Sequence, residues 1–166
     1  MPDPFPTSPT SFRIGHGYDI HRLQSGGQLV LGGIVVANDV SPIAYSDGDV
    51  AIHSLMDAIL GAMAWGDIGD LFPNTNPRWK NAASIIFLNE VLGRLNATGA
   101  RIINADLTIL AERPKLGPIK KHIAEYLSQL LNCPVNVKAG THEGCDAIGR
   151  AEAIACHAVV LLALKN

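Results

Sequence analysis

The sequence contains only three cysteines, Cys133, Cys145 and Cys156, and no Cys-x-x-Cys pair. An odd number of scattered cysteines argues against a disulfide framework and favours a reducing compartment, for which we expect the cytoplasm. Aromatic residues are also scarce, at 5% of the chain, although hydrophobic residues of all kinds reach 48%. The core should therefore consist mainly of aliphatic side chains.

An excess of basic charge is lacking as well, because the formal net charge is −2. Proteins that bind nucleic acids or membrane surfaces in general need a basic patch, so we expect neither partner. The longest apolar stretch, residues 151–164, is interrupted by Glu152 and His157. It is too short and too polar to cross a bilayer.

The length of 166 residues suits one domain with its own hydrophobic core. Residues 1–11 hold four prolines and lack the basic and apolar regions of a secretory signal. We expect a disordered leader over residues 1–11 and a single domain over residues 12–166.

Apolar periodicity predicts several strands and helices. We expect strands over 12–21, 28–31, 34–36, 101–112 and 135–139, and helices from about 50, over 82–97 and over 118–131. Gly32-Gly33 predicts a hairpin turn, and Ser46 and Asp49 have capping-box spacing before the first helix. Residues 66–73 and 140–149 read as loops.

Residues 151–164 fit a helix by their alanines and a buried strand by their two-sided apolar character. With a strand there, the order of elements predicts an α/β (α+β) fold, a mixed sheet with helices on one face. The other face of such a strand would lack cover. We therefore expect this face to meet a partner subunit.

Asp19 and His21 are the strongest candidates for chemistry. On a strand, residues two apart point the same way, and Gly15 and Gly17 share that face. His53 follows on the first helix, so one carboxylate and two imidazoles could hold zinc with one position open. The alternative is three unrelated polar residues. Asp57, four residues after His53, would orient its ring or simply face solvent.

Other candidates follow predicted strands or begin helices. Residues 46–49 would cap a helix or bind an anion, and residues 66–69 would cradle a substrate or form a turn. Thr141 offers a hydroxyl that can donate a hydrogen bond to phosphate, and Glu143 offers a carboxylate ligand for a hard cation. Lys115 would place a positive charge near phosphate, or it is an ordinary exposed lysine. From the residues alone we predict a metal-assisted enzyme acting on a phosphorylated substrate.

Six segments follow one another along the chain: residues 13–21, 46–53, 66–73, 114–116, 138–143 and 149–156. Together they resemble the 2-C-methyl-D-erythritol 2,4-cyclodiphosphate synthase family, over about residues 12–164. The family implies a homotrimer packed around a three-fold axis, with active sites between subunits. It also implies conversion of 4-diphosphocytidyl-2-C-methyl-D-erythritol 2-phosphate to the cyclodiphosphate with release of CMP, a phosphorus–oxygen lyase reaction of non-mevalonate isoprenoid synthesis.

The resemblance also implies roles for single residues. Asp19, His21 and His53 would bind one zinc ion per subunit, and Glu143 a magnesium or manganese ion. Thr141 and Glu143 are the expected catalytic residues. The expected substrate-binding residues are Tyr45, Ser46, Asp67, Gly69, Asn74, Pro114, Lys115, Leu116, Ala139, Gly140 and Arg150.

The sequence departs from the family pattern at two of these positions, Tyr45 and Asn74, and at the nearby Asn76. Tyr45 stands where histidine is usual, and Asn74 and Asn76 stand where aspartates are common. Two other functions remain open at this level: a zinc-dependent phosphohydrolase, which would give a linear product, and a non-catalytic trimeric binding module.

Overall fold

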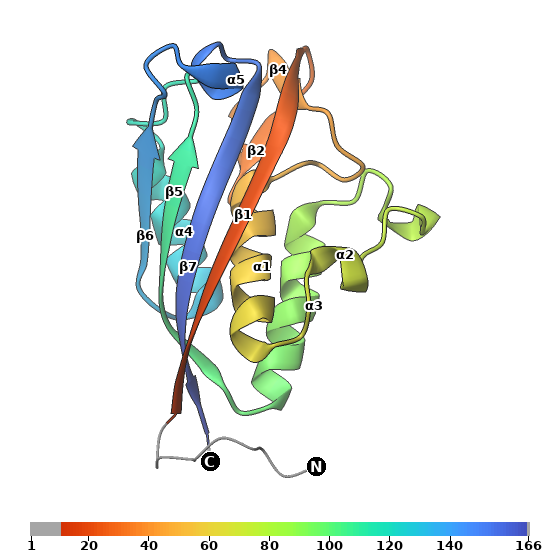
Figure 1. Ribbon diagram of the computed structural model, residues 1–166, viewed down its shortest axis with the longest axis vertical. Helices are drawn as coiled ribbons and strands as arrows, with labels where there is room; N and C mark the ends of the chain where they lie inside the picture. Colours follow the sequence, from red (N-terminus) through yellow and green to blue (C-terminus); the bar gives the residue numbers. More distant parts are fainter. Residues whose placement is uncertain (1–10, 166) are drawn as a thin grey trace.

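A computed structural model describes residues 11–165 of the chain (Figure 1). The expected leader therefore lies outside the described residues, except for Ser11. The elements in chain order are β1 Ser11–Ser25, β2 Leu29–Leu31, β3 Ile34–Ala37, β4 Val40–Pro42, α1 Val50–Met63, α2 Ile68–Leu71, the 3₁₀ helix η1 Pro77–Trp79, α3 Ser84–Ala97, β5 Arg101–Leu110, α4 Lys120–Leu131, β6 Val135–Gly140, α5 Asp146–Gly149 and β7 Ala153–Leu164.

Five strands form the main sheet in the order β4-β1-β7-β5-β6. Only the β5–β6 pair is parallel, so the predicted mixed sheet is confirmed. The predicted hairpin is also confirmed, since β2 and β3 pair in a small sheet of their own. Residues 153–164 form a strand that pairs with β1 along twelve positions, which settles the ambiguity of the last segment.

The helices α1, α3 and α4 pack with one face of the sheet into a single aliphatic core (Figure 1). Fully buried members come from α1, α4 and the sheet: Leu55, Ile59, Ile123, Leu127, Leu107 and Ile109. The expected aliphatic core on one face is confirmed. Within the described residues, every helix is too short or too polar to span a bilayer.

The opposite face of the sheet carries exposed apolar side chains. Phe12, Ile14, Tyr18, Ile20 and Val159 are 40% to 72% exposed, and all belong to β1 or β7. The short helix α5 packs against Ala153, Ala155 and Leu110 at one end of this face. In the described chain the rest of it has no helical cover, as the sequence predicts.

Asp49, not Ser46, is the N-cap of α1, so the expected position of the cap is wrong. The buried Asp49 carboxylate accepts hydrogen bonds from the backbone N–H groups of Ala51 and Ile52, and from Gly32 and Gly33 in the β2–β3 turn. One side chain thus satisfies four backbone donors and fixes the start of α1 against the hairpin. This anchoring places the first turn of α1, and with it His53.

Four short elements were not expected from the sequence: β4, α2, η1 and α5. β4 is an edge strand of three residues that contains a proline. α2 and α5 lie inside segments that we expected to be loops. Asp67 and Asp70 cap α2 reciprocally, which stabilises a single helical turn in a glycine-containing segment.

Candidate functional site

Two glycines of β1 allow α1 to lie directly on the strand. A Cβ atom on Gly17 would lie 1.9 Å from the carbonyl oxygen of Ser54, and one on Gly15 would lie 1.7 Å from that of Ala58. Any side chain at either position would therefore push the helix away. The close contact brings His53, on α1, next to Asp19 and His21, on β1.

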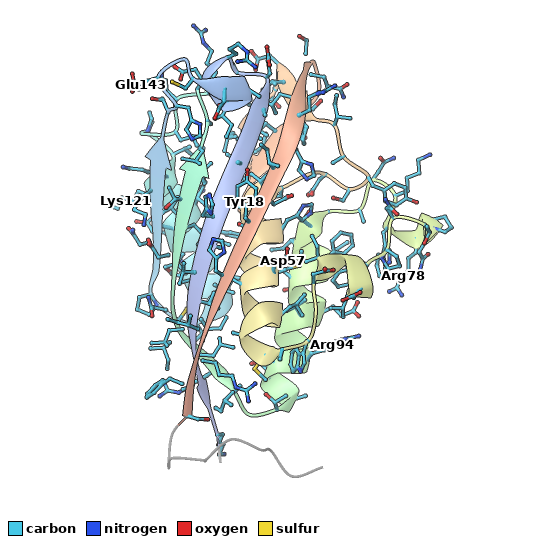
Figure 2. All side chains as sticks on the ribbon, viewed as in Figure 1. Tyr18, Asp57, Arg78, Arg94, Lys121 and Glu143 are labelled. Carbon is cyan, nitrogen blue, oxygen red and sulfur yellow. The ribbon has the colours of Figure 1, made fainter. Side chains whose placement is uncertain are left out.

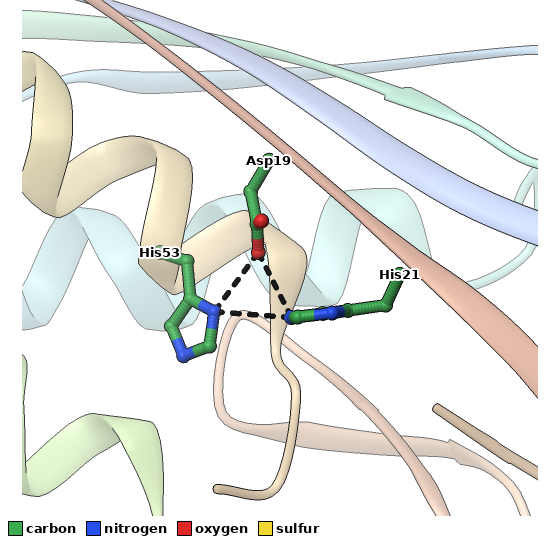
Figure 3. A group of neighbouring side chains, drawn as sticks. All are labelled: Asp19, His21 and His53. Carbon is green, nitrogen blue, oxygen red and sulfur yellow. Dashed lines mark hydrogen bonds and ion pairs between the residues drawn. The ribbon is translucent and has the colours of Figure 1, made fainter. Parts of the chain in front are cut away.

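The predicted trio converges (Figure 3). Oδ2 of Asp19 lies 2.9 Å from Nδ1 of His53 and 3.1 Å from Nε2 of His21, and the two nitrogens are 3.4 Å apart. Zinc bonds to nitrogen and oxygen of about 2.0–2.1 Å imply about 3.3 Å between neighbouring tetrahedral ligands. The three atoms form one face of such a tetrahedron, so the donor set fits a divalent metal ion with a fourth position open.

The electrostatics of the trio favour positive charge between these groups. Burial alone would raise the pKa of the Asp19 carboxyl, but hydrogen bonds with His21 and His53 outweigh it, and the pKa falls well below its usual range. Burial alone would lower the pKa of His53, but the contact with Asp19 reverses this, and the pKa is raised. The site therefore holds a carboxylate that stays ionised and needs a cationic partner.

The other nitrogen of His53 contacts serines and not Asp57. Nε2 lies 2.8 Å from Oγ of Ser84 and 3.3 Å from Oγ of Ser46. Asp57 accepts a hydrogen bond from the backbone N–H of Ile68 and thus holds the start of α2. The role that we considered for Asp57, orienting the His53 ring, therefore falls to Ser84, the first residue of α3.

A cavity of about 450 Å³ opens beside the trio. Asp19, His21 and His53 line it together with four of the predicted substrate-binding residues, Tyr45, Ser46, Gly69 and Asn74. Asp67 is placed differently, as the N-cap of α2 next to Gly69. The apolar side of the cavity is formed by Ala44, Met56, Ile68, Phe72, Pro73, Trp79 and Phe87.

The aromatic part of this wall was not identified from the sequence. The rings of Phe72 and Phe87 stack at 4.7 Å between centroids, and Trp79 meets both edge-on. These residues come from the α2 C-terminus, η1 and α3, so their proximity depends on tertiary folding. The sequence gives no sign of this cluster, because the spacing of the three aromatic residues matches neither the helical nor the strand period.

The structure places the remaining predicted residues elsewhere. Asp19 pairs across the sheet with Cys156, which pairs with Ile109, which pairs with Ala139 on β6. Three strand spacings separate the metal trio from Ala139, a distance of about 14 Å. Gly140 is the last residue of β6, and Thr141 and Glu143 follow it in the chain. Figure 2 shows Glu143 beyond that end of the sheet.

This second group has its own polar contacts. The Thr141 hydroxyl donates a hydrogen bond to the Glu143 carboxylate, 2.8 Å away. Nε and Nη2 of Arg150 each donate a hydrogen bond of 3.0 Å to one oxygen of the Glu152 carboxylate. Pro114 and Lys115 line a separate hollow of about 610 Å³ near Leu23 and Ala151, and Leu116 is buried. Within one chain, the predicted site residues therefore lie in two separate groups.

The fold and the trio define a class, the α/β proteins with a candidate metal-binding centre built between a glycine-containing strand and a helix. A family model described as the YgbB family matches residues 12–163. The chain belongs to the YgbB family.

Relatives of known name agree with this assignment. The 2-C-methyl-D-erythritol 2,4-cyclodiphosphate synthase of Aliivibrio salmonicida is 47% identical over 93% of this chain and 99% of its own length. The chloroplastic synthase of Arabidopsis thaliana is 47% identical over 96% of this chain and 71% of its own length. A solved structure of the synthase in a CDP-bound form has a TM-score of 0.83 at 42% identity, covering 90% of this chain and 99% of that one.

Proposed function

We propose that this protein converts 4-diphosphocytidyl-2-C-methyl-D-erythritol 2-phosphate to 2-C-methyl-D-erythritol 2,4-cyclodiphosphate and CMP in non-mevalonate isoprenoid synthesis. The observation that carries the proposal is the set of three donor atoms within 3.4 Å of one another beside a cavity of about 450 Å³. Family membership over residues 12–163 supports the substrate class.

Zinc is the metal that we assign to Asp19, His21 and His53, since two imidazoles and a carboxylate are typical zinc ligands at sites with an open position. We assign magnesium or manganese to Glu143, because a carboxylate suits hard cations. A bound divalent ion would neutralise phosphate charge and polarise a phosphoryl oxygen.

The bond changes balance without a further reactant. An oxygen of the 2-phosphate forms a bond to the β-phosphorus, the bond from the β-phosphorus to the bridging oxygen breaks, and CMP leaves with the electron pair. Both phosphates belong to one substrate, so the protein has mainly to orient them. Ser46 and Asn74 offer polar groups in the cavity, and Phe72 and Trp79 exclude water from its apolar side.

A homotrimer would unite the two groups of residues. Glu143 lies beyond β6, whereas the metal trio lies against β1, and about 14 Å of sheet separates the two strands. We infer that Thr141, Glu143, Pro114, Lys115 and Ala139 complete the site of a neighbouring copy. The exposed apolar face of β1 and β7 supports packing of three copies through this face.

We also propose a cytoplasmic location and membership of the phosphorus–oxygen lyases. All three cysteines are free, as in proteins of reducing compartments. The Arabidopsis relative is named chloroplastic, so fractionation of the source cells is the measurement that decides the compartment.

Product analysis tests the proposed reaction. The purified protein with zinc and magnesium should release CMP from the diphosphocytidyl substrate, and ³¹P NMR should show a cyclic diphosphate. A linear phosphate product would support the phosphohydrolase instead. Absence of any turnover, in a folded protein with zinc bound, would contradict both enzymatic functions.

A further inference from the structure

Two polar side chains, those of Ser84 and Asp47, lie behind His53 on the side of its Nε2 atom. Ser84 Oγ lies 2.8 Å from Nε2 of His53, and its hydroxyl donates to Oδ1 of Asp47. The backbone N–H of Ser84 donates to the other oxygen of Asp47 at 3.0 Å. Asp47 thus accepts both donors of Ser84, and Ser84 is fully buried.

The direction of these hydrogen bonds fixes the proton on His53. A carboxylate only accepts, so the single hydrogen of the Ser84 hydroxyl is committed to Asp47. The Ser84 oxygen is left to accept, and Nε2 of His53 must therefore donate. Without a metal ion, a proton on Nδ1 forms the hydrogen bond to Oδ2 of Asp19, 2.9 Å away. In the neutral ring that would bind a metal ion, Nδ1 instead carries a lone pair on this side. A cation between the two atoms makes this arrangement favourable.

We propose that Ser84 and Asp47 are positioning residues, which hold His53 in the Nε2–H tautomer with its Nδ1 lone pair directed at Asp19 and His21 and so strengthen binding of a divalent metal ion. This inference rests on the proposed metal site and adds the residues that orient it. Partners of this kind typically contribute 10- to 100-fold to metal affinity.

Ser84 acts through His53 and not on a substrate. It is absent from the lining of the cavity, whereas Ser46, the other serine near Nε2, lines it. A change at Ser84 therefore separates the orientation of His53 from contacts with a bound molecule. Ser54 is the matched control, because it is also a fully buried serine beside His53 in the chain, but its hydroxyl donates to the backbone oxygen of Ala51.

The test measures zinc affinity of the folded protein by competition with a chromophoric chelator. Ser84→Ala should weaken zinc binding by about 10- to 100-fold, whereas Ser54→Ala should stay within about twofold of the wild type. Asp47→Asn, which leaves the Ser84 side chain in place, should weaken binding in the same direction. It serves as the second variant if Ser84→Ala fails to fold, with thermal unfolding as the check.

Imidazole ¹⁵N NMR of the zinc-loaded proteins gives a readout independent of affinity. In the wild type, His53 should show a protonated Nε2 with slow hydrogen exchange, and in Ser84→Ala that proton should exchange faster. Unchanged affinity and exchange in the folded Ser84→Ala or Asp47→Asn protein would overturn the positioning role alone. A wild-type protein that binds no divalent metal would overturn the metal centre and this role together.

Discussion

Nδ1 of His53 lies 2.9 Å from Oδ2 of Asp19, although the two residues are 34 positions apart and belong to different elements. Local structure aims both side chains at one point. Asp19 shares a strand face with His21, and His53 lies in the first turn of a helix whose start is fixed by Asp49. The chemistry that we propose depends on this convergence, and the following predictions test it.

Replacing His53 by alanine should abolish metal binding and activity. One of the three donor atoms is lost, so zinc measured by elemental analysis should fall from about one per chain to near zero. CMP release should fall by more than the roughly 100-fold that the loss of a supporting residue costs. His122→Ala is the control, since His122 is an exposed histidine on α4. Full turnover by His53→Ala would refute the assignment of the trio.

Gly17→Ala should weaken metal binding without removing any ligand. The new Cβ would lie 1.9 Å from the Ser54 carbonyl oxygen, so α1 must move away from β1 and carry His53 with it. We expect a loss of about 1–3 kcal/mol in the free energy of unfolding, as for overpacking, together with weaker zinc binding.

The control for this substitution is Gly61→Ala. Gly61 lies on the exposed side of the same helix, and a Cβ there would meet no atom within 4 Å. That variant should gain about 0.5–1 kcal/mol in stability. If Gly17→Ala binds zinc as tightly as Gly61→Ala, the close approach of strand and helix is not what assembles the trio.

Much of this site could be predicted because its ligands obey local rules. The same-face relation of Asp19 and His21 follows from the period of a strand. The role of Ser84 could not be predicted in this way. It lies 31 residues from His53, and as the first residue of α3 it is indistinguishable in sequence from a serine that only starts a helix.

The fold shows the same division. Long periodic segments such as β1, α3 and α4 are readable from hydrophobic spacing, whereas β4 is three residues long, contains a proline and is defined only by pairing with β1. The separation of Glu143 from the trio is also beyond local rules, because it follows from the strand order. Only the register Asp19–Cys156–Ile109–Ala139 reveals it.

The free energy of unfolding should decrease at alkaline pH through Cys156. Burial raises the pKa of this thiol to about 12, against 9.0 for an unperturbed thiol. Below pH 9 the thiol is protonated in both states. Between about pH 9 and 12 only the unfolded chain releases the proton, so the contribution to stability is lost as the pH rises.

Chemical denaturation of the wild type and Cys156→Ala at pH 8 and pH 10 measures this effect. The stability advantage of the wild type over the variant should shrink by about 1.4 kcal/mol between these pH values. Cys145→Ala is the control, because it removes an exposed thiol and not a buried one. An advantage that stays constant with pH would contradict the raised pKa of Cys156.

Ile14→Glu should prevent self-association. The Ile14 side chain is 72% exposed on the outer face of β1, where a buried carboxylate would be costly in an assembly of copies. Sedimentation should show a trimer for the wild type and a monomer for this variant. Ile86→Glu, 52% exposed on α3, changes the charge equally on a helical surface and should leave the trimer intact. A wild-type monomer at micromolar concentration would rule out the assembly.

Two inactive variants should restore activity to one another. His53→Ala lacks one of the three metal ligands, and Glu143→Gln lacks the carboxylate that we place in the site of a neighbouring copy. In mixed trimers, a site that takes its trio from a Glu143→Gln chain and its Glu143 from a His53→Ala chain is complete. Random mixing around a closed three-fold ring makes about one quarter of the sites complete, so up to about one quarter of wild-type turnover should return. If one chain supplies both groups to the same site, every site in the mixture lacks one of them, and CMP release stays at the level of the separate variants.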